Sequence, residues 1–149
     1  MKHVRIHLET THTEKKSSVP IDTSYWGKLW DTYTSDFASV EIHSWLEERE
    51  QLEELSKIAA NSIEQGLVKA FTVTLNEENC NYLRNHSIDS NGGLKWFTIF
   101  FYKEDTQMLE IAQYGSEIVL YGVDKKEAAE FETLFLENAK AEYFKEHLM

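Results

Sequence analysis

The sequence predicts an α+β fold, in which helices pack against a mostly antiparallel sheet of about five strands. Three observations lead to this prediction. Residues 96–102 are almost all aromatic or β-branched, which is typical of a strand covered on both faces in the middle of a sheet. Two more strand patterns follow, and a long amphipathic helix pattern comes after them. With 149 residues, 42% of them hydrophobic, the chain is expected to form one domain over residues 1–149.

The first half of the chain predicts two strands and two helices. Apolar and polar residues alternate over residues 3–9, which predicts a half-buried strand. Ser44 and Glu47 form a capping-box pattern, and Gly66 suits the end of the helix that they begin. The β-forming residues 67–75 predict the next strand. Each helix has an apolar stripe at helical spacing: Trp26, Leu29, Trp30, Tyr33 and Phe37 in the first, and Leu52, Leu55, Ala59 and Ile63 in the second.

The second half of the chain predicts a short helix, a three-stranded meander and a long C-terminal helix. The short helix covers residues 77–86, and the glycine pair that follows it predicts a turn before the central strand at 94–102. Strands at 108–114 and 118–123 complete an antiparallel C-terminal β-meander. The last helix is expected to pack against the sheet; its cap and apolar stripe are Asp124, Glu127, Ala128, Phe131, Phe135, Ala139 and Tyr143.

The composition excludes several classes of function. The chain carries 26 acidic and 15 basic side chains, for a formal net charge of −11. Nucleic-acid binders obtain much of their affinity from Lys and Arg on phosphates, so no nucleic-acid partner is expected. The N-terminus lacks the apolar core of a secretory signal, and no apolar run is long enough to span a membrane. We therefore expect a cytoplasmic protein without a membrane partner, whose acidic surface suits a basic partner.

Residue types that carry catalysis or bind metals are scattered along the chain. His3 and His7 lie four residues apart on one predicted strand, a distance of about 13 Å, which is too far for one metal ion. Cys80 is the sole cysteine, which excludes a disulfide and a zinc cluster. The sequence contains no nucleophile elbow and no phosphate loop, so it predicts no catalytic residue, no metal site and no cofactor. The alternative is an enzyme whose site is assembled only in the fold, with His43 or His86 beside a carboxylate.

Aromatic residues gather between positions 25 and 45, and they suggest a pocket or an interaction hot spot. The candidates are Trp26, Trp30, Tyr33 and Trp45. The competing interpretation, which we favour for Trp26 and Trp30, is that a helical stripe of aromatic residues packs against the sheet. Trp45 differs because it falls at the predicted start of the second helix, where its ring could stay partly exposed. A cavity lined by these rings would instead indicate a small-molecule-binding module.

An acidic helix face is the strongest indication of function. Glu47, Glu50 and Glu54 project opposite the apolar stripe of the second predicted helix, and Glu50 and Glu54 repel one another at i, i+4 spacing. Carboxylates near a helix N-terminus complement the helix dipole, which explains part of the pattern as a solvated face. The part of the acidic pattern that the helix dipole does not explain predicts a surface that meets Lys or Arg on another molecule. The leading hypothesis is a non-enzymatic protein-binding module of the immunity, antitoxin or inhibitor type, which neutralises a basic partner.

A small apolar patch is predicted near the C-terminus. Phe144 and Leu148 fall on the side of the last predicted helix that is turned away from its main stripe. If they are exposed there, they would form a contact between two copies of the chain, giving a homodimer. A neighbouring loop that covers them is the equally supported alternative.

Overall fold

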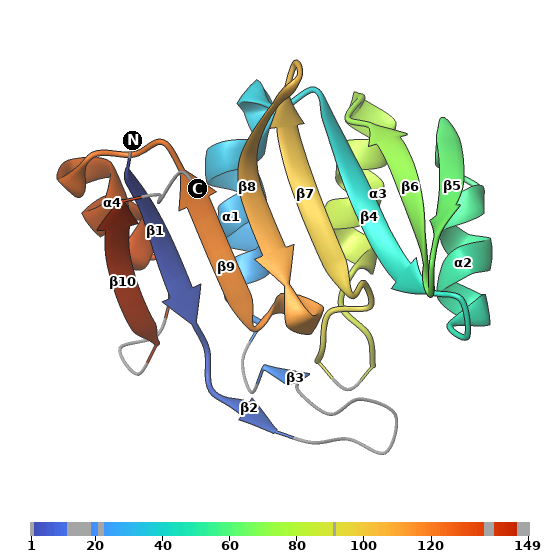
Figure 1. Cartoon of the computed structure of the whole chain (residues 1–149), viewed down its shortest axis with the longest axis horizontal. Coiled ribbons are helices and arrows are strands. Elements are labelled where there is room, and N and C mark those ends of the chain that lie inside the picture. The colour runs from blue at the N-terminus through green and yellow to red at the C-terminus, as the bar shows by residue number, and fades with distance from the viewer. Residues whose placement is uncertain (1, 12–18, 21–22, 91, 136–138, 146–149) are drawn as a thin grey trace.

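One antiparallel sheet of eight strands organises the described part of the chain, which comprises residues 2–11, 19–20, 23–90, 92–135 and 139–145 of this computed structural model. The strands lie in the order β10–β1–β9–β8–β7–β4–β6–β5 (Figure 1). Their bounds are β1 Lys2–His7, β4 Ser39–Trp45, β5 Asn61–Gln65, β6 Val68–Thr74, β7 Thr98–Lys103, β8 Thr106–Ala112, β9 Glu117–Tyr121 and β10 Lys140–Lys145. A separate pair forms a small second sheet: β2 (Thr10–Thr11) and β3 (Val19–Pro20).

The four α-helices of the described residues all lie on one face of the large sheet (Figure 1). They are α1 (Tyr25–Tyr33), α2 (Arg49–Ser56), α3 (Glu77–His86) and α4 (Lys125–Glu132), with short 3-10 turns at Thr34–Asp36 and Gln113–Gly115. At the start of α4, Asp124 and Glu127 form the capping box that the sequence predicts. None of these helices is long and apolar enough to cross a membrane.

The core lies between the helices and the sheet. Trp26 and Trp30 on α1 are only 2% and 4% exposed, and their ring centroids are 5.5 Å apart. The Trp30 ring also contacts Phe101 of β7 edge to face, at 5.6 Å. Along β4, buried residues that face the helices, such as Val40 and Ile42, alternate with half-buried residues on the other side. The aromatic stripe of the first helix therefore packs against the sheet, as the core-packing interpretation predicts.

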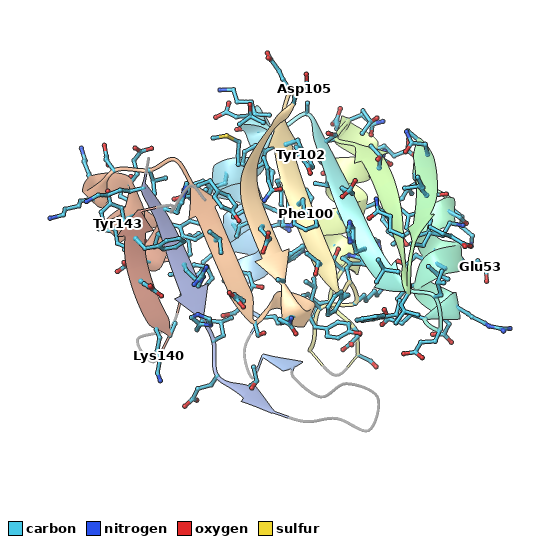
Figure 2. All side chains as sticks on the ribbon, in the orientation of Figure 1. Glu53, Phe100, Tyr102, Asp105, Lys140 and Tyr143 are labelled. Atoms are coloured by element: carbon cyan, nitrogen blue, oxygen red, sulfur yellow. The ribbon has the colours of Figure 1, made fainter. Side chains whose placement is uncertain are left out.

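The opposite face of the sheet carries no helix within the described part of the chain, and we call it the open face (Figure 1). Aromatic and charged side chains mix on it and are mostly half-buried; Figure 2 shows Phe100 and Tyr102 of β7 on this side. Arg5 on β1 lies 3.3 Å from the Glu117 carboxylate on β9 and 3.9 Å from that of Glu142 on β10. These ion pairs between neighbouring strands offset part of the negative charge on the open face.

The prediction of about five strands is wrong, because the sheet has eight: β4, β5 and β10 lie where the sequence predicts helices or loops. Ser44 does not cap a helix: it is a fully buried residue of β4, and α2 begins at Arg49. Because α2 ends at Ser56, Ile63 leaves the predicted helical stripe and lies in β5. Apolar residues three and four apart in a short segment do not distinguish a helix from a helix followed by a strand. Residues 61–65 form a strand and do not continue the helix, because they pair with β6.

The prediction of a long C-terminal helix is also wrong. Helix α4 ends at Glu132, and β10 follows it and pairs antiparallel with β1, placing Tyr143 opposite Val4. Ala128 and Phe131 are buried as the stripe predicts, but the stripe does not continue as one helix to Tyr143. Without β10, the backbone N–H and C=O groups along one side of β1 would be unpaired at a sheet edge. Satisfying them by strand pairing outweighs the helical spacing of a few apolar residues.

The central position of β7 is confirmed, because β7 lies between β4 and β8. The predicted meander is present as β7, β8 and β9, which pair consecutively. The expectation that both faces of β7 are covered is wrong. Ile99 and Phe101 face the helices and are buried, whereas Phe100 and Tyr102 face the other way and are half-buried. Rings packed side by side on an open face bury much of their area without a second layer, so an apolar run does not require one.

Candidate functional site

The four aromatic candidates from the sequence separate into two groups. Trp26 and Trp30 lie in the core, and Tyr33 is half-buried with its ring 5.2 Å from that of Phe131. Neither the pocket between α4 and β10 nor the pocket beside Trp45 is lined by these three residues. Trp45 alone of the four candidates lies on the open face, as the last residue of β4.

The three acidic candidates also separate. Glu47, in the turn before α2, and Glu50, in its first turn, are exposed. Glu54 is half-buried and turned inward, where its carboxylate accepts a hydrogen bond from the Tyr82 hydroxyl and lies 3.1 Å from Lys95 Nζ. Burial and then the bond to Glu54 raise the pKa of Tyr82 to about 12. Glu54 therefore fastens α2 to α3 and to the segment before β7, and the structure does not present it alongside Glu47 and Glu50.

The two self-association candidates lie on or beyond β10. Phe144 is a half-buried residue of that strand, with the His3 ring centroid at 5.5 Å and the Arg5 guanidinium 4.7 Å from its own ring centroid. Leu148 lies outside the described residues. Phe144 therefore belongs to a strand, and not to the outer side of a helix as the sequence predicts. That strand, β10, forms one edge of the sheet. A contact between two copies through Phe144 stays a prediction.

Three aromatic rings from three neighbouring strands meet at one end of the open face. Trp45 ends β4, Phe97 directly precedes β7, and Tyr114 follows β8. The ring centroids of Trp45 and Phe97 are 4.9 Å apart, and those of Phe97 and Tyr114 are 5.4 Å apart. Antiparallel pairing brings the ends of β4 and β8 beside the start of β7, so residues distant in sequence form one row. All three side chains are half-buried, so each keeps surface that a partner can cover.

Glu48 holds this row of rings in place. Its carboxylate accepts a hydrogen bond from the Trp45 backbone N–H at 2.9 Å and another from the Tyr114 hydroxyl at 3.2 Å. Burial, followed by the charge of Glu48, raises the pKa of Tyr114 far above its ordinary value, so the phenol keeps its proton and donates it to the bond. Hydrogen bonds to a carboxylate are stronger than neutral ones. Glu48 is thus engaged within the protein, and Glu47 beside it is exposed.

The backbone that presents Tyr114 is strained. Gln113 and Tyr114 have φ of 54° and 56°, a left-handed conformation that costs about 1–3 kcal/mol at each residue with a side chain. Gly115 follows with φ of 92°, and a Cβ there would lie 2.8 Å from the Tyr25 hydroxyl oxygen. That hydroxyl donates a hydrogen bond to the Gly115 carbonyl oxygen at 2.8 Å. The buried Tyr25 therefore anchors the strained turn, which places the Tyr114 ring against Phe97.

An exposed leucine and a shallow pocket extend the row of rings toward the edge of the sheet. Leu67, in the turn between β5 and β6, is 73% exposed, and its carbonyl oxygen accepts the Leu46 backbone N–H at 3.0 Å. A pocket of about 300 Å³ is lined by Trp45, Leu46, Glu47 and Leu67. We name the following set the aromatic corner: Trp45, Leu46, Leu67, Phe97 and Tyr114. The exposed carboxylate of Glu47 borders it.

A histidine–carboxylate pair also lies on the open face, in the middle of β4. His43 Nε2 is 2.8 Å from Glu41 Oε2, whereas the His86 ring stacks on Tyr82 with centroids 4.8 Å apart. Neither pocket described above includes His43 or Glu41, so the pair occupies a sheet surface and not one of those hollows. Burial raises the pKa of the Cys80 thiol, which disfavours a reactive thiolate. Among the described residues, no three His, Cys, Asp or Glu side chains are grouped so as to hold a metal ion.

Sequence reasoning misses most of the aromatic corner. Leu67 resembles the first residue of a strand, Phe97 resembles part of a doubly covered strand, and Tyr114 resembles a strand end. Two glycines are the signals that could have found the site. Gly66 before Leu67 marks a hairpin turn whose tip is exposed, and Gly115 after Tyr114 marks a turn at the end of a strand.

Comparison of the chain with protein-family models, with curated protein sequences and with solved structures finds no match in any of the three. The aromatic corner and its acidic border are therefore the basis on which a function can be assigned. The corner itself comes from contacts between segments far apart in the sequence, whereas Glu47 directly follows Leu46.

Proposed function

We propose that this protein is a non-enzymatic binding module that neutralises a basic protein partner, in the manner of an immunity, antitoxin or inhibitor protein. The observation that carries the proposal is the exposed Leu67 beside the Trp45 pocket, with the carboxylate of Glu47 at its border. Aromatic rings held rigidly beside exposed apolar surface, with a polar rim, have the composition of interaction hot spots. The strained turn at Tyr114 supports the same assignment, because strain of this kind collects at functional sites.

An arginine or lysine side chain of the partner fits this corner chemically. Its aliphatic stem would lie along Leu67 and the Trp45 ring, and its charged end would meet the Glu47 carboxylate. A cation over an indole ring adds about 0.5–1 kcal/mol at an exposed site. The pocket of about 300 Å³ is at the lower limit for small-molecule sites, so its size suits one anchoring side chain.

The distribution of charge supports a basic partner as well. The chain has a formal net charge of −11, and Glu47, Glu50 and Glu53 are exposed around α2. A field of one sign attracts an oppositely charged protein over several ångströms, which raises the association rate and makes it sensitive to salt. We assign this attraction to Glu47, Glu50 and Glu53, because Glu54 already contacts Lys95 and Tyr82.

The proposal is tested with two substitutions at exposed positions of the site. Partners are captured from native lysate on the full chain at low and high ionic strength, identified, and purified for kinetic measurements. We expect Glu47→Lys to slow association and to weaken its dependence on salt. Leu67→Ser should instead speed dissociation, because it removes apolar contact without changing the charge. Both residues are exposed, so the free energy of unfolding should change by less than about 0.5 kcal/mol.

The control is Glu132→Lys, which makes the same charge change at an exposed position on α4, behind the opposite end of the sheet. It should reduce association only through the general loss of negative charge. A partner that binds the Glu47→Lys and Leu67→Ser proteins as fast and as long as the unchanged protein would disprove the proposal. A small molecule that copurifies, with no protein partner at either ionic strength, would favour the ligand-binding alternative.

A further inference from the structure

The edge of the sheet next to the aromatic corner is open to strand pairing. Among the described strands, β5 pairs with β6 alone, and all five residues of β5 are exposed. One side of an edge strand presents backbone N–H and C=O groups that another strand can pair with, and lysine or proline usually protects such edges. Strand β10, at the other edge, begins and ends with lysine, and Figure 2 shows Lys140 there, whereas β5 contains neither lysine nor proline.

The two faces of β5 have different chemistry. Ile63 lies opposite Ala70 of β6, which lies opposite His43 on the open face, so Ile63 is also on the open face, where it is 60% exposed. Among the described residues, Ile63 and Leu67 are the exposed large apolar side chains, and both belong to the β5–β6 hairpin. The edge therefore continues the apolar surface of the aromatic corner.

The helix-facing side of the same edge is acidic. Ser62 lies opposite the buried Phe71, so Glu64, two residues further on, points to the helix side of the sheet. Figure 2 shows Glu53 on α2 at the outer margin of the molecule, on the side where β5 ends the sheet. Lys69 lies opposite Glu64 on β6, with its Nζ 5.5 Å from the Phe71 ring centroid.

From this edge we infer that an extended segment of the basic partner adds to β5 as a ninth strand of the sheet. The inference rests on the proposed function. Backbone hydrogen bonds along β5 supply the pairing, as in other cases of strand addition. Side chains of the added strand alternate between the two faces, so apolar residues meet Ile63 while lysines or arginines meet Glu64 and Glu53. The partner segment is thus a strand in which apolar and basic residues alternate.

Charge also decides between this partner and a second copy of the chain. Two β5 strands paired antiparallel would bring together two chains that each carry a net charge of −11, and Glu64 and Glu53 of both copies would meet at the same edge. Like charges across neighbouring strands are unfavourable. A basic strand converts the same carboxylates into favourable contacts.

The test uses the full chain and two synthetic eight-residue peptides as probes, one alternating lysine with valine and one alternating glutamate with valine. Amide hydrogen exchange is followed residue by residue by nuclear magnetic resonance, with millimolar peptide. We expect the lysine–valine peptide to slow exchange about tenfold or more at the outward-facing amides of β5, because they become hydrogen-bonded. The glutamate–valine peptide should leave them unchanged. Ile63→Ser and Glu64→Lys should each weaken this protection, whereas Glu142→Lys on β10 should not.

Three outcomes would overturn the inference: no slowing at β5 amides, equal slowing with both peptides, or slowing confined to β10. Slowing of β5 without peptide, rising with protein concentration, would assign the edge to a second copy and also overturn it. Once a partner has been identified, the same exchange measurement separates this inference from the proposed function. A partner whose binding depends on Glu47 and Leu67 while β5 amides stay unprotected would disprove strand addition alone.

Discussion

At the scale of single residues, the carboxylates around α2 show that position relative to the sheet decides what an acidic side chain does. Glu48 bonds the Trp45 backbone and the Tyr114 hydroxyl, and Glu54 meets Lys95 and Tyr82, so both are structural. A helical wheel groups Glu50 with Glu54, four residues later, but it contains no information about which neighbours each one meets. Only the fold brings Lys95 and Tyr82 to Glu54, so this part of the candidate site could not be derived from the sequence.

The Tyr82 hydroxyl predicts a change in stability at alkaline pH. Its raised pKa means that the folded protein keeps the phenol proton at pH values where the unfolded chain, with a tyrosine pKa near 10, releases it. Unfolding therefore releases a proton in this range. The raised pKa of Tyr82 therefore adds to the free energy of unfolding in full below pH 10, and this added stability is lost as the pH rises toward about 12. Urea unfolding across this range should show a steeper fall for the unchanged protein than for Tyr82→Phe; equal slopes would contradict the assignment.

The strained turn at the aromatic corner predicts that one substitution to glycine is stabilising. Gln113 is exposed and has φ of 54°, which glycine adopts without steric cost. We expect Gln113→Gly to raise the free energy of unfolding by up to about 1 kcal/mol, measured by urea unfolding. The same change at Gln107, inside β8, should lower it, because glycine weakens a strand interior. A loss of stability at both positions would show that the turn at Gln113 stores no strain.

At the scale of elements, local signals predict the start of α4 and the buried face of α1, but not the start or the end of α2. Asp124 and Glu127 cap α4, and the stripe of α1 is buried at Trp26 and Trp30. The sequence does not reveal β5 and β10, because neither edge strand shows a clear alternation of apolar and polar residues. Their existence depends on a neighbour, β6 or β1, whose backbone needs a partner. Pairing between residues as distant as Val4 and Tyr143 leaves no periodic signal in either segment.

Strand β10 can be tested with one substitution made in two places. Ala141 in β10 and Ala129 in α4 are both exposed and line the same pocket, which has a volume of about 410 Å³. Valine is favoured in strands and disfavoured in helices, by about 0.5 kcal/mol in each case. We therefore expect Ala141→Val to raise the free energy of unfolding and Ala129→Val to lower it, as measured by urea unfolding. A decrease at both positions would indicate that the chain around Ala141 is helical.

At the scale of the whole molecule, all described helices lie on one side of the sheet, so the two faces of the sheet differ (Figure 1). The sequence predicts the α+β class and the position of β7 correctly, but not the open face. The run from Trp96 to Tyr102 reads as one continuous apolar segment, because both sides of the strand carry aromatic residues. The two sides use these residues differently. Ile99 and Phe101 fill the core, whereas Phe100 packs against the His43 ring on the surface, at 5.1 Å. Residue type alone does not separate these two uses.

Two neighbouring phenylalanines of β7 provide the test of this one-sided arrangement. Phe101 is fully buried, with the Trp30 and Phe37 rings 5.6 and 5.7 Å away, so Phe101→Ala leaves a cavity and should lower the free energy of unfolding by about 3–5 kcal/mol. Phe100 is half-buried on the open face, where water fills the space that its ring leaves. Phe100→Ala should therefore cost only about 1–2 kcal/mol. Urea unfolding of both variants measures the difference. Equal losses would mean that the second face of β7 is covered as completely as the first, which would contradict the open face and the binding role assigned to it.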